Sequence, residues 1–220
     1  MGSAEANGAR PSARRSKADV VDAALGILDR QGLPDVTMRR IAEVLGVQPS
    51  ALYWHFPNKQ TLLAAVSDRI LAPSGLLPSG DIAPWTANIA GIASRFRDCL
   101  LAYRDAAELV SSSLALGLVT PSAQHLIADV AIRADVPAPL ARVAASTITH
   151  YVLGYTFHEQ QRMQADSLGA LADVESLTPS GAAVGASATT DFHAGIGLIV
   201  LGMSVSVAGA QDRGTRKTRR

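Results

Sequence analysis

The chain has 220 residues, of which 48% are hydrophobic, 18% charged and 5% aromatic. This length and apolar content suffice for a buried core and exclude a mostly disordered chain. The low aromatic content, with abundant Ala, Leu, Val and Ser, favours helices over sandwiches or barrels, so we expect an all-α fold. The single cysteine, Cys99, excludes a disulfide framework and a thiolate zinc site, and it is typical of a cytoplasmic protein.

Charge is distributed unevenly along the chain. Residues 1–61 include eight basic and six acidic residues, residues 62–212 include seven and thirteen, and residues 213–220 include five basic residues and no acidic one. The two ends of the chain are basic and the middle is acidic. This pattern predicts a polyanionic partner for the two ends only. Residues 1–16 lack the apolar segment of a secretory signal and are expected to be a disordered basic arm, with a second basic tail over residues 212–220.

Helical periodicity and helix start and stop residues predict four helices in the first third of the chain, over residues 17–30, 37–46, 49–55 and 58–71. Thr37 and Asn58 are good N-cap residues, and Pro49 suits the first position of a helix. Gly32 and Gly46 suit helix ends, and Pro57 terminates the third helix.

The second and third of these helices have the sequence form of a helix-turn-helix. Gly46 permits the positive φ that the turn needs, and Val47 packs the turn onto the core. Ile41 and Leu52 hold the two helices at a fixed angle. We therefore expect a DNA-binding domain over residues 17–57.

The remaining residues, 58–211, predict a larger helical domain for ligand binding and dimerisation. Residues 58–71 are its connecting helix, and further helices are expected over residues 85–103, 106–116, 121–134, 137–164 and 188–210. Pro121 and Pro137 suit helix starts. A loop is expected over residues 75–80, and weak periodicity predicts a flexible loop over residues 166–187.

The segment from Phe192 to Gln211 contains no charged residue and approaches the length of a membrane span. Gly195, Gly202 and Gly209 recur every seven residues and form a stripe that another backbone can approach closely. Because no second apolar segment of this kind occurs, we expect a buried helix of a dimer and no membrane association. A membrane anchor is the alternative.

The run VTMRRIAEVLGVQPSALYWHFPNKQTLL, from Val36 to Leu63, resembles the DNA-binding signature of the tetracycline-repressor (TetR) family of bacterial regulators. Weaker similarity to the family's tetracycline-binding members continues through residues 96–105, 150–162 and 192–202. The resemblance implies an all-helical fold and a cytoplasmic, nucleoid-associated transcriptional repressor. It also implies a homodimer held by a four-helix bundle from the helices near residues 137–164 and 188–210.

DNA recognition needs phosphate contacts for affinity and base contacts for sequence. We expect the DNA-binding residues to be Thr37, Arg39, Gln48, Ser50, Ala51, Tyr53, Trp54, His55 and Lys59. Arg39 can bind a guanine edge or a phosphate, and Gln48, Ser50 and Ala51 are the expected base readers. The alternative for Tyr53, Trp54 and Phe56 is that they close the small core of this domain.

An apolar pocket with a few polar groups is expected in the larger domain. Its predicted lining comprises Ile92, Phe96, Val110, Ser113, Leu116, Leu153, Phe157 and His158, with Ile127 and Val130 as further candidates; plain core packing is the alternative for each. Val110 and His158 stand where tetracycline-binding members have a magnesium-ligating His and an acidic residue. We therefore expect a small hydrophobic effector other than tetracycline–magnesium, and no metal or cofactor.

Catalytic constellations are absent from the sequence. His158 to Arg162 reads HEQQR and is no HExxH motif, and the nucleotide-binding and nucleophile-elbow patterns do not occur. A ligand or metal role for His150 and His158, eight residues apart, stays open. We expect a ligand-responsive repressor that binds a palindromic double-stranded operator as a homodimer and is no enzyme. The alternative is a small-molecule-binding or enzymatic protein with a vestigial helix-turn-helix.

Overall fold

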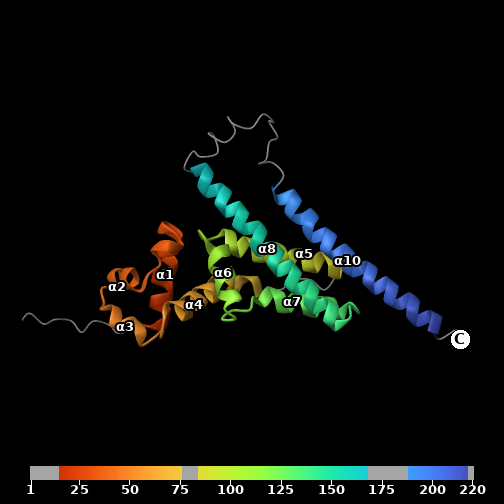
Figure 1. Cartoon of the computed structure of the whole chain (residues 1–220), viewed down its shortest axis with the longest axis horizontal. Coiled ribbons are helices and arrows are strands. Elements are labelled where there is room, and N and C mark those ends of the chain that lie inside the picture. Colours follow the sequence, from red (N-terminus) through yellow and green to blue (C-terminus); the bar gives the residue numbers. More distant parts are fainter. Residues whose placement is uncertain (1–14, 76–83, 168–187, 218–220) are drawn as a thin grey trace, which may run out of the picture.

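The computed structural model describes residues 15–75, 84–167 and 188–217, with side chains placed up to residue 206 (Figure 1). Over these ranges the chain is helical and contains no strand, so the predicted all-α class is confirmed. The helices are α1 (Lys17–Gln31), η1 (Leu33–Asp35), α2 (Met38–Leu45), α3 (Pro49–Tyr53), α4 (Lys59–Leu71), η2 (Ala72–Gly75), α5 (Trp85–Leu101), α6 (Ala106–Ala115), α7 (Ser122–Arg133), α8 (Ala138–Ser167) and α10 (Ala188–Lys217).

Local sequence explains where the first helices begin. Ser16 and Asp19 form a reciprocal capping box at the start of α1: Asp19 N donates to Ser16 Oγ (3.1 Å), and Ser16 N donates to Asp19 Oδ2 (2.8 Å). The bond from the Ser16 backbone N–H, helped by the Ser16 side chain, lowers the pKa of the Asp19 carboxyl. Thr37 caps α2 and Asn58 caps α4, as predicted, each accepting a bond from the backbone N–H three residues on.

The helices α1, α2 and α3 form a small unit at one end of the molecule, called the N-terminal unit below (Figure 1). Helix α4 leaves this unit and packs against both α1 and α6. The remaining helices, α5 to α10, form the helical core, whose longest members are α8 and α10. Ile89, Ile92, Phe96 and Leu100 are fully buried there on one face of α5. Helix α4 thus connects the N-terminal unit to the helical core covalently and also packs against both.

Several helix boundaries differ from the predictions. Helix α3 ends at Tyr53, and the next residues form a tight turn in which both His55 N and Phe56 N donate to Leu52 O, because the residue before Pro57 is disfavoured in a helix. Pro121 occupies the N-cap position of α7, one residue before the first helical position. Pro137 directly precedes α8, and its carbonyl accepts a bond from Ala141 N.

The C-terminal helix is longer than predicted. The helix predicted over residues 188–210 continues as helical backbone to Lys217, so the predicted basic tail is helical over residues 212–217. Among the described residues no helix is both long and apolar enough to cross a membrane.

Some predicted segments fall outside the described residues. They are most of the basic arm (residues 1–14), residues 76–83, the loop over 168–187 and residues 218–220. The predicted loop is shorter at its start than expected, because Asp166 and Ser167 belong to α8.

Candidate DNA interface and effector domain

The predicted helix-turn-helix is present as α2, a three-residue turn and α3. Gly46 adopts φ 67°, and its N–H closes the end of α2, while Val47 N donates to Ala42 O (3.0 Å). Ile41 and Leu52 are fully buried between the helices. The left-handed glycine and this apolar pair fix the angle at which α3 is presented.

Aromatic residues at the end of α3 divide into one core residue and two exposed ones. Phe56 is 1% exposed and closes the core of the N-terminal unit, with Lys17 Nζ 5.0 Å from its ring centroid. Trp54 is 90% exposed and Tyr53 is half exposed. The alternative that these aromatic residues close the core is therefore correct for Phe56 and wrong for Trp54. The indole of Trp54 is accessible to another molecule.

The predicted DNA-binding residues gather on one unit of the structure, and none of them is buried. Thr37, Arg39, Gln48, Ser50, Tyr53 and Trp54 are exposed, and Ala51, His55 and Lys59 are half-buried. Gln48 makes no capping hydrogen bond, so its amide stays available for a base edge. Thr37 Oγ1 accepts a bond from Arg40 N (3.1 Å), which leaves its hydroxyl proton for a phosphate oxygen.

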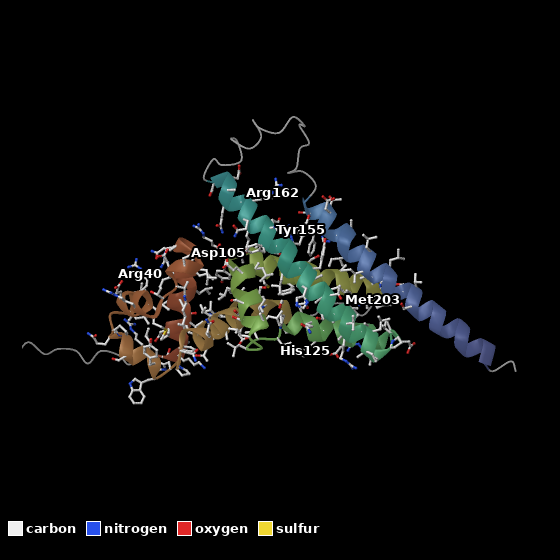
Figure 2. The ribbon with its side chains drawn as sticks, viewed as in Figure 1. Arg40, Asp105, His125, Tyr155, Arg162 and Met203 are labelled. Carbon is white, nitrogen blue, oxygen red and sulfur yellow. The ribbon has the colours of Figure 1, made fainter. Side chains whose placement is uncertain are left out.

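Glu43 is a feature of this surface that the sequence analysis missed. Its carboxylate pairs with Arg39 Nε (3.4 Å) and with Arg40 Nη1 (3.3 Å), and all three side chains are exposed. Arg40 lies at the outer edge of the N-terminal unit (Figure 2). A spacing of three and four residues on a predicted helix was the signal that could have identified this pair of contacts.

A buried polar contact joins the connecting helix to the helical core. Ser67 on α4 and Ser113 on α6 are both fully buried, and their hydroxyl oxygens lie 3.2 Å apart in hydrogen-bond contact. Ser113 is one of the predicted effector residues. This contact joins α4 directly to α6 within the buried core.

A second connection runs through Asp105, which lies where α1 meets the helical core (Figure 2). Asp105 is buried and has φ 54°. Its Oδ2 accepts a bond from Leu33 N (2.9 Å), in the connection between α1 and α2, and its Oδ1 accepts one from Gln164 on α8. A Cβ on Gly32 would lie 2.7 Å from Asp105 Oδ2, so only glycine leaves room for this contact.

The turn that carries Asp105 is itself held by α8. Gln160 is buried, and its Nε2 donates to the carbonyls of Leu100 (2.9 Å) and Tyr103 (2.8 Å) while its Oε1 accepts from Ala107 N (3.2 Å). A single amide thus satisfies three backbone groups between α5 and α6. No local sequence pattern predicts these contacts, because the partners lie 53 to 60 residues apart.

The predicted effector residues fall into two groups. Ile92, Phe96, Val110, Ser113 and Leu153 are buried together with Ile127 and Val130 in the contiguous core, and Phe157 is half-buried against it. Leu116 is 57% exposed and His158 is exposed, so the structure does not bring these two into the buried group. Ligand contact remains a prediction for all of them.

A groove of about 360 Å³ lies between α6 and α8. Leu153 and Phe157 line it from α8, and Ala107, Ser111 and Ala115 from α6. Gly154 leaves the space beside it open, since nothing lies within 4 Å of where its Cβ would be. Two predicted effector residues thus reach a surface that a small molecule could enter.

Aromatic packing anchors α10 on α8 and α5. Phe192 is fully buried, with the rings of Tyr151 and Tyr155 within 5.7 Å and the Arg97 guanidinium 5.1 Å from its centroid. Arg97 donates through Nε (3.0 Å) and Nη2 (2.6 Å) to the carboxylate of Glu159. Burial raises the pKa of both tyrosine hydroxyls.

The predicted glycine stripe on the last helix is not uniform. A Cβ on Gly195 would collide with the hydroxyl of Tyr151, so this glycine serves packing within the chain. Gly202 has nothing within 4 Å of a Cβ, and the surroundings of Gly209 lie outside the described side chains. Gly195 and Gly202 differ in their surroundings: Gly195 faces the large side chain of Tyr151, whereas the space beside Gly202 is open.

The histidines considered for metal binding are both exposed. His150 Nδ1 lies 2.7 Å from the Ser146 carbonyl of its own helix. In the part of the chain that the structure describes, no three His, Cys, Asp or Glu side chains come together in a metal-binding arrangement.

Comparison with known proteins matches both parts of the chain to regulator families. Residues 20–66 match the model described as bacterial regulatory proteins, tetR family, and residues 77–180 match the tetracyclin repressor-like C-terminal domain. The class E tetracycline repressor of Escherichia coli is 30% identical over 203 residues, or 89% of this chain and 93% of that protein. The class A repressor from transposon 1721 is 37% identical, and the match spans 65% of its length.

Solved structures agree with this assignment. BioQ of Mycobacterium smegmatis is 40% identical with a TM-score of 0.76, covering 87% of this chain and 99% of that one. A structure of BioQ with its double-stranded DNA operator is 41% identical with a TM-score of 0.64, covering 76% and 99%. A TetR variant from Acinetobacter baumannii AYE in complex with minocycline is 26% identical with a TM-score of 0.69, covering 88% and 98%. The chain belongs to the tetR family of bacterial regulatory proteins and is a DNA-binding transcriptional regulator with a helix-turn-helix.

Proposed function

We propose that the protein is a repressor that binds a palindromic operator as a homodimer and is released by a small hydrophobic molecule bound in the helical core. The observation that carries this proposal is the exposed row of Gln48, Ser50, Tyr53 and Trp54 in and directly beside α3, close to the exposed Arg39 of α2. The relative solved with its operator supports the same use of the unit. Residues 17–57 act on DNA in the cytoplasm, and residues 58–211 sense the effector.

Each part of the exposed row suits a different contact. Gln48, Ser50 and Ala51 lie at the start of α3, the end that enters a major groove in helix-turn-helix proteins. Tyr53 ends α3, and His55 and Lys59 follow it; these three side chains suit phosphates, with Lys59 at the first position of α4. Arg39 can bind a guanine edge or a phosphate once its ion pair with Glu43 breaks on contact with DNA.

The exposed apolar surface supports a homodimer. Leu198, Leu201 and Val205 are 72%, 60% and 64% exposed and lie on one side of α10. Val143 and Met163 on α8 are exposed as well. Leu198, Leu201 and Val205 are three and four positions apart, a spacing that suits packing in a bundle with a second copy. In the dimer the two α3 helices must lie about 34 Å apart to read successive major grooves.

The effector acts through the connections between the core and the N-terminal unit. Ser113 carries movement of α6 to α4, and Asp105 ties the α5–α6 turn to the backbone beside α1. Either connection changes the orientation of α3 when the core shifts. Linkage makes the effect reciprocal: an effector that weakens DNA binding tenfold is itself bound tenfold more weakly by the DNA complex.

The effector we propose is a small hydrophobic molecule other than tetracycline–magnesium. The relative that holds minocycline supports a small-molecule site in this fold. In this chain Val110 is fully buried and His158 is exposed, and neither offers a magnesium ion the oxygen ligands it prefers.

A mobility-shift titration against the DNA flanking the protein's own gene, at two salt concentrations, tests the proposal. We expect saturable binding that survives excess random competitor and weakens steeply with salt, because each phosphate contact releases a counterion. If the protein bound this DNA no more tightly than random DNA, the proposal that it binds its operator without an effector would be contradicted.

A double variant separates regulation from the vestigial alternative. Arg39→Ala with Tyr53→Ala removes two exposed contacts, so operator affinity should fall by at least about thirtyfold at roughly 1–3 kcal/mol each. The unfolding midpoint should stay within about 1 °C, because neither side chain is buried. Unchanged operator affinity would favour a protein whose helix-turn-helix no longer reads DNA.

A further inference from the structure

Arg95 on α5 carries a buried guanidinium edge without a hydrogen-bond partner among the residues that the structure describes. The side chain is half-buried, but its Nε and Nη2 atoms are inaccessible to solvent and make no hydrogen bond. Among the described residues, only Thr156 also holds a buried side-chain polar atom without a partner, and that group is a neutral hydroxyl. Among the described residues, Arg95 is therefore the one charged side chain with buried polar atoms that lack a hydrogen-bond partner.

Arg97, two residues further along α5, shows what such an edge binds. Its Nε and Nη2 donate in parallel to the two carboxylate oxygens of Glu159. Nε and Nη2 form the same edge of the guanidinium in Arg95, and two N–H groups on one edge match the two oxygens of a carboxylate or another oxyanion. The two arginines differ in that Arg97 has its carboxylate within the chain and Arg95 does not.

The surroundings of Arg95 suit an effector better than a protein partner. Its neighbours one turn before and one residue after, Ile92 and Phe96, are fully buried residues predicted to contact the effector. The unsatisfied Nε and Nη2 atoms are inaccessible to solvent, and they lie on α5, whereas the proposed dimer face lies on α8 and α10 and the proposed DNA surface on α2 and α3.

We propose that the effector carries an oxyanion, in the simplest case a carboxylate, that Arg95 binds through Nε and Nη2. This inference rests on the proposed function and deepens it, since it names the chemical class of the molecule that releases the operator. A buried unpaired guanidinium costs stability, and binding of the anion offsets that cost. The effector is thus amphipathic, with an apolar body and a negatively charged end.

The first test needs no effector. Arg95→Met keeps an unbranched, apolar side-chain stem and removes the unsatisfied charge, so the midpoint of thermal unfolding should rise by about 2 °C or more. Arg133→Met, at an exposed arginine of α7, should leave it unchanged within about 1 °C. A clear fall in the midpoint of Arg95→Met would show that the guanidinium stabilises the free protein and would overturn the proposal.

The second test uses Cys99, one turn after Arg95 and the single cysteine of the chain, as a reporter. Burial raises the pKa of its thiol and the charge of Arg95 lowers it, so an anion on Arg95 should raise this pKa further. We expect sodium sulfate, compared with sodium chloride at equal ionic strength, to shift the pH profile of Cys99 thiol reactivity upward in the wild type. Arg95→Met should show no shift, and Arg133→Met should respond like the wild type.

The third test measures operator release with octanoate and its neutral analogue octanamide as probes. Octanoate should weaken operator binding of the wild type at least about tenfold, within the usual range of allosteric coupling, and of Arg95→Met less than about twofold. Octanamide should change neither by more than about twofold. Equal responses of the two proteins, or no response of the wild type to sulfate and octanoate alike, would overturn the proposal.

The outcomes separate this inference from the proposed function. A wild-type protein that does not bind its operator contradicts the proposed function, whatever sulfate does at Cys99. A wild-type protein that binds its operator while Arg95→Met and the wild type respond equally to the anions leaves the repressor in place and removes only the anionic effector.

Discussion

At the scale of single residues, the DNA surface depends on which charged side chains are held by others. Arg39 and Arg40 share the carboxylate of Glu43, and all three are exposed. Such pairs add little to folding stability in water. We expect Glu43 to affect DNA binding in two ways. Its carboxylate repels phosphates, and it competes for Arg39, which would otherwise contact the phosphates of any sequence.

Replacing this carboxylate should loosen discrimination between sequences. In Glu43→Gln we expect affinity for random DNA to rise about two- to fivefold, with a steeper salt dependence, while operator affinity rises less. Parallel titrations on operator and random duplexes measure the ratio, and Glu108→Gln, at an exposed glutamate of α6, is the matched control. A rise in operator affinity that equals or exceeds the rise on random DNA would contradict this role.

At the scale of elements, the N-terminal unit is fastened to the helical core by α4 and by Asp105. The carboxylate of Asp105 accepts one bond from Leu33 N and one from Gln164, and its own turn is braced by Gln160. An asparagine has a single acceptor oxygen, so it can keep only one of these two bonds. The orientation of the N-terminal unit therefore depends on an acceptor pair that asparagine cannot replace.

We expect Asp105→Asn to lower the free energy of unfolding by about 1–3 kcal/mol, because a buried donor loses its acceptor. Hydrogen exchange at the Leu33 amide should accelerate more than exchange in α8. Denaturant unfolding and exchange measure the two effects. Asp135→Asn tests the backbone cost alone, since Asp135 has φ 62° and is exposed, and it should change stability by less than about 0.5 kcal/mol.

The capping box of α1 makes a prediction about pH. The pKa of Asp19 is lowered in the folded protein, so its carboxylate contributes stability above its ordinary pKa of 3.8, and that contribution is lost as the pH falls through the lowered value. The stability difference between the wild type and Asp19→Asn should therefore be largest near neutral pH and shrink below about pH 4. A difference that does not depend on pH between these limits would show that the charge of Asp19 is not what caps α1.

At the scale of the whole molecule, the two longest helices carry apolar surface that one chain does not cover. Phe192, Ile196 and Met203 of α10 are buried within the chain, whereas Leu198 and Leu201 are largely exposed. One side of α10 thus packs on its own core and another side is left for a second copy. Because two operator half-sites need two α3 helices at a fixed spacing, DNA affinity should depend on this second side.

Charges on that side should separate the subunits. In the double variant Leu198→Asp with Leu201→Asp we expect a monomer in sedimentation and a loss of operator affinity of at least about a hundredfold, with helicity retained. Leu118→Asp, at an exposed leucine outside α8 and α10, should stay dimeric and bind the operator. A double variant that remains a dimer would place the interface elsewhere.

Sequence by itself determined the features that depend on near neighbours. Cap residues, the glycine at position 46 and the periodic apolar positions set the helices, since their hydrogen bonds and contacts span a few residues. The motif around Tyr53, a run of neighbouring residues, predicted the DNA surface from the sequence alone. Tertiary structure alone decided that Trp54 is exposed while Phe56 is buried, that Gly195 faces Tyr151, and that Asp105 reaches Leu33. These facts depend on which helices pack against one another. The residues in contact lie tens of positions apart in the sequence, so neither their spacing nor the composition predicts the contact.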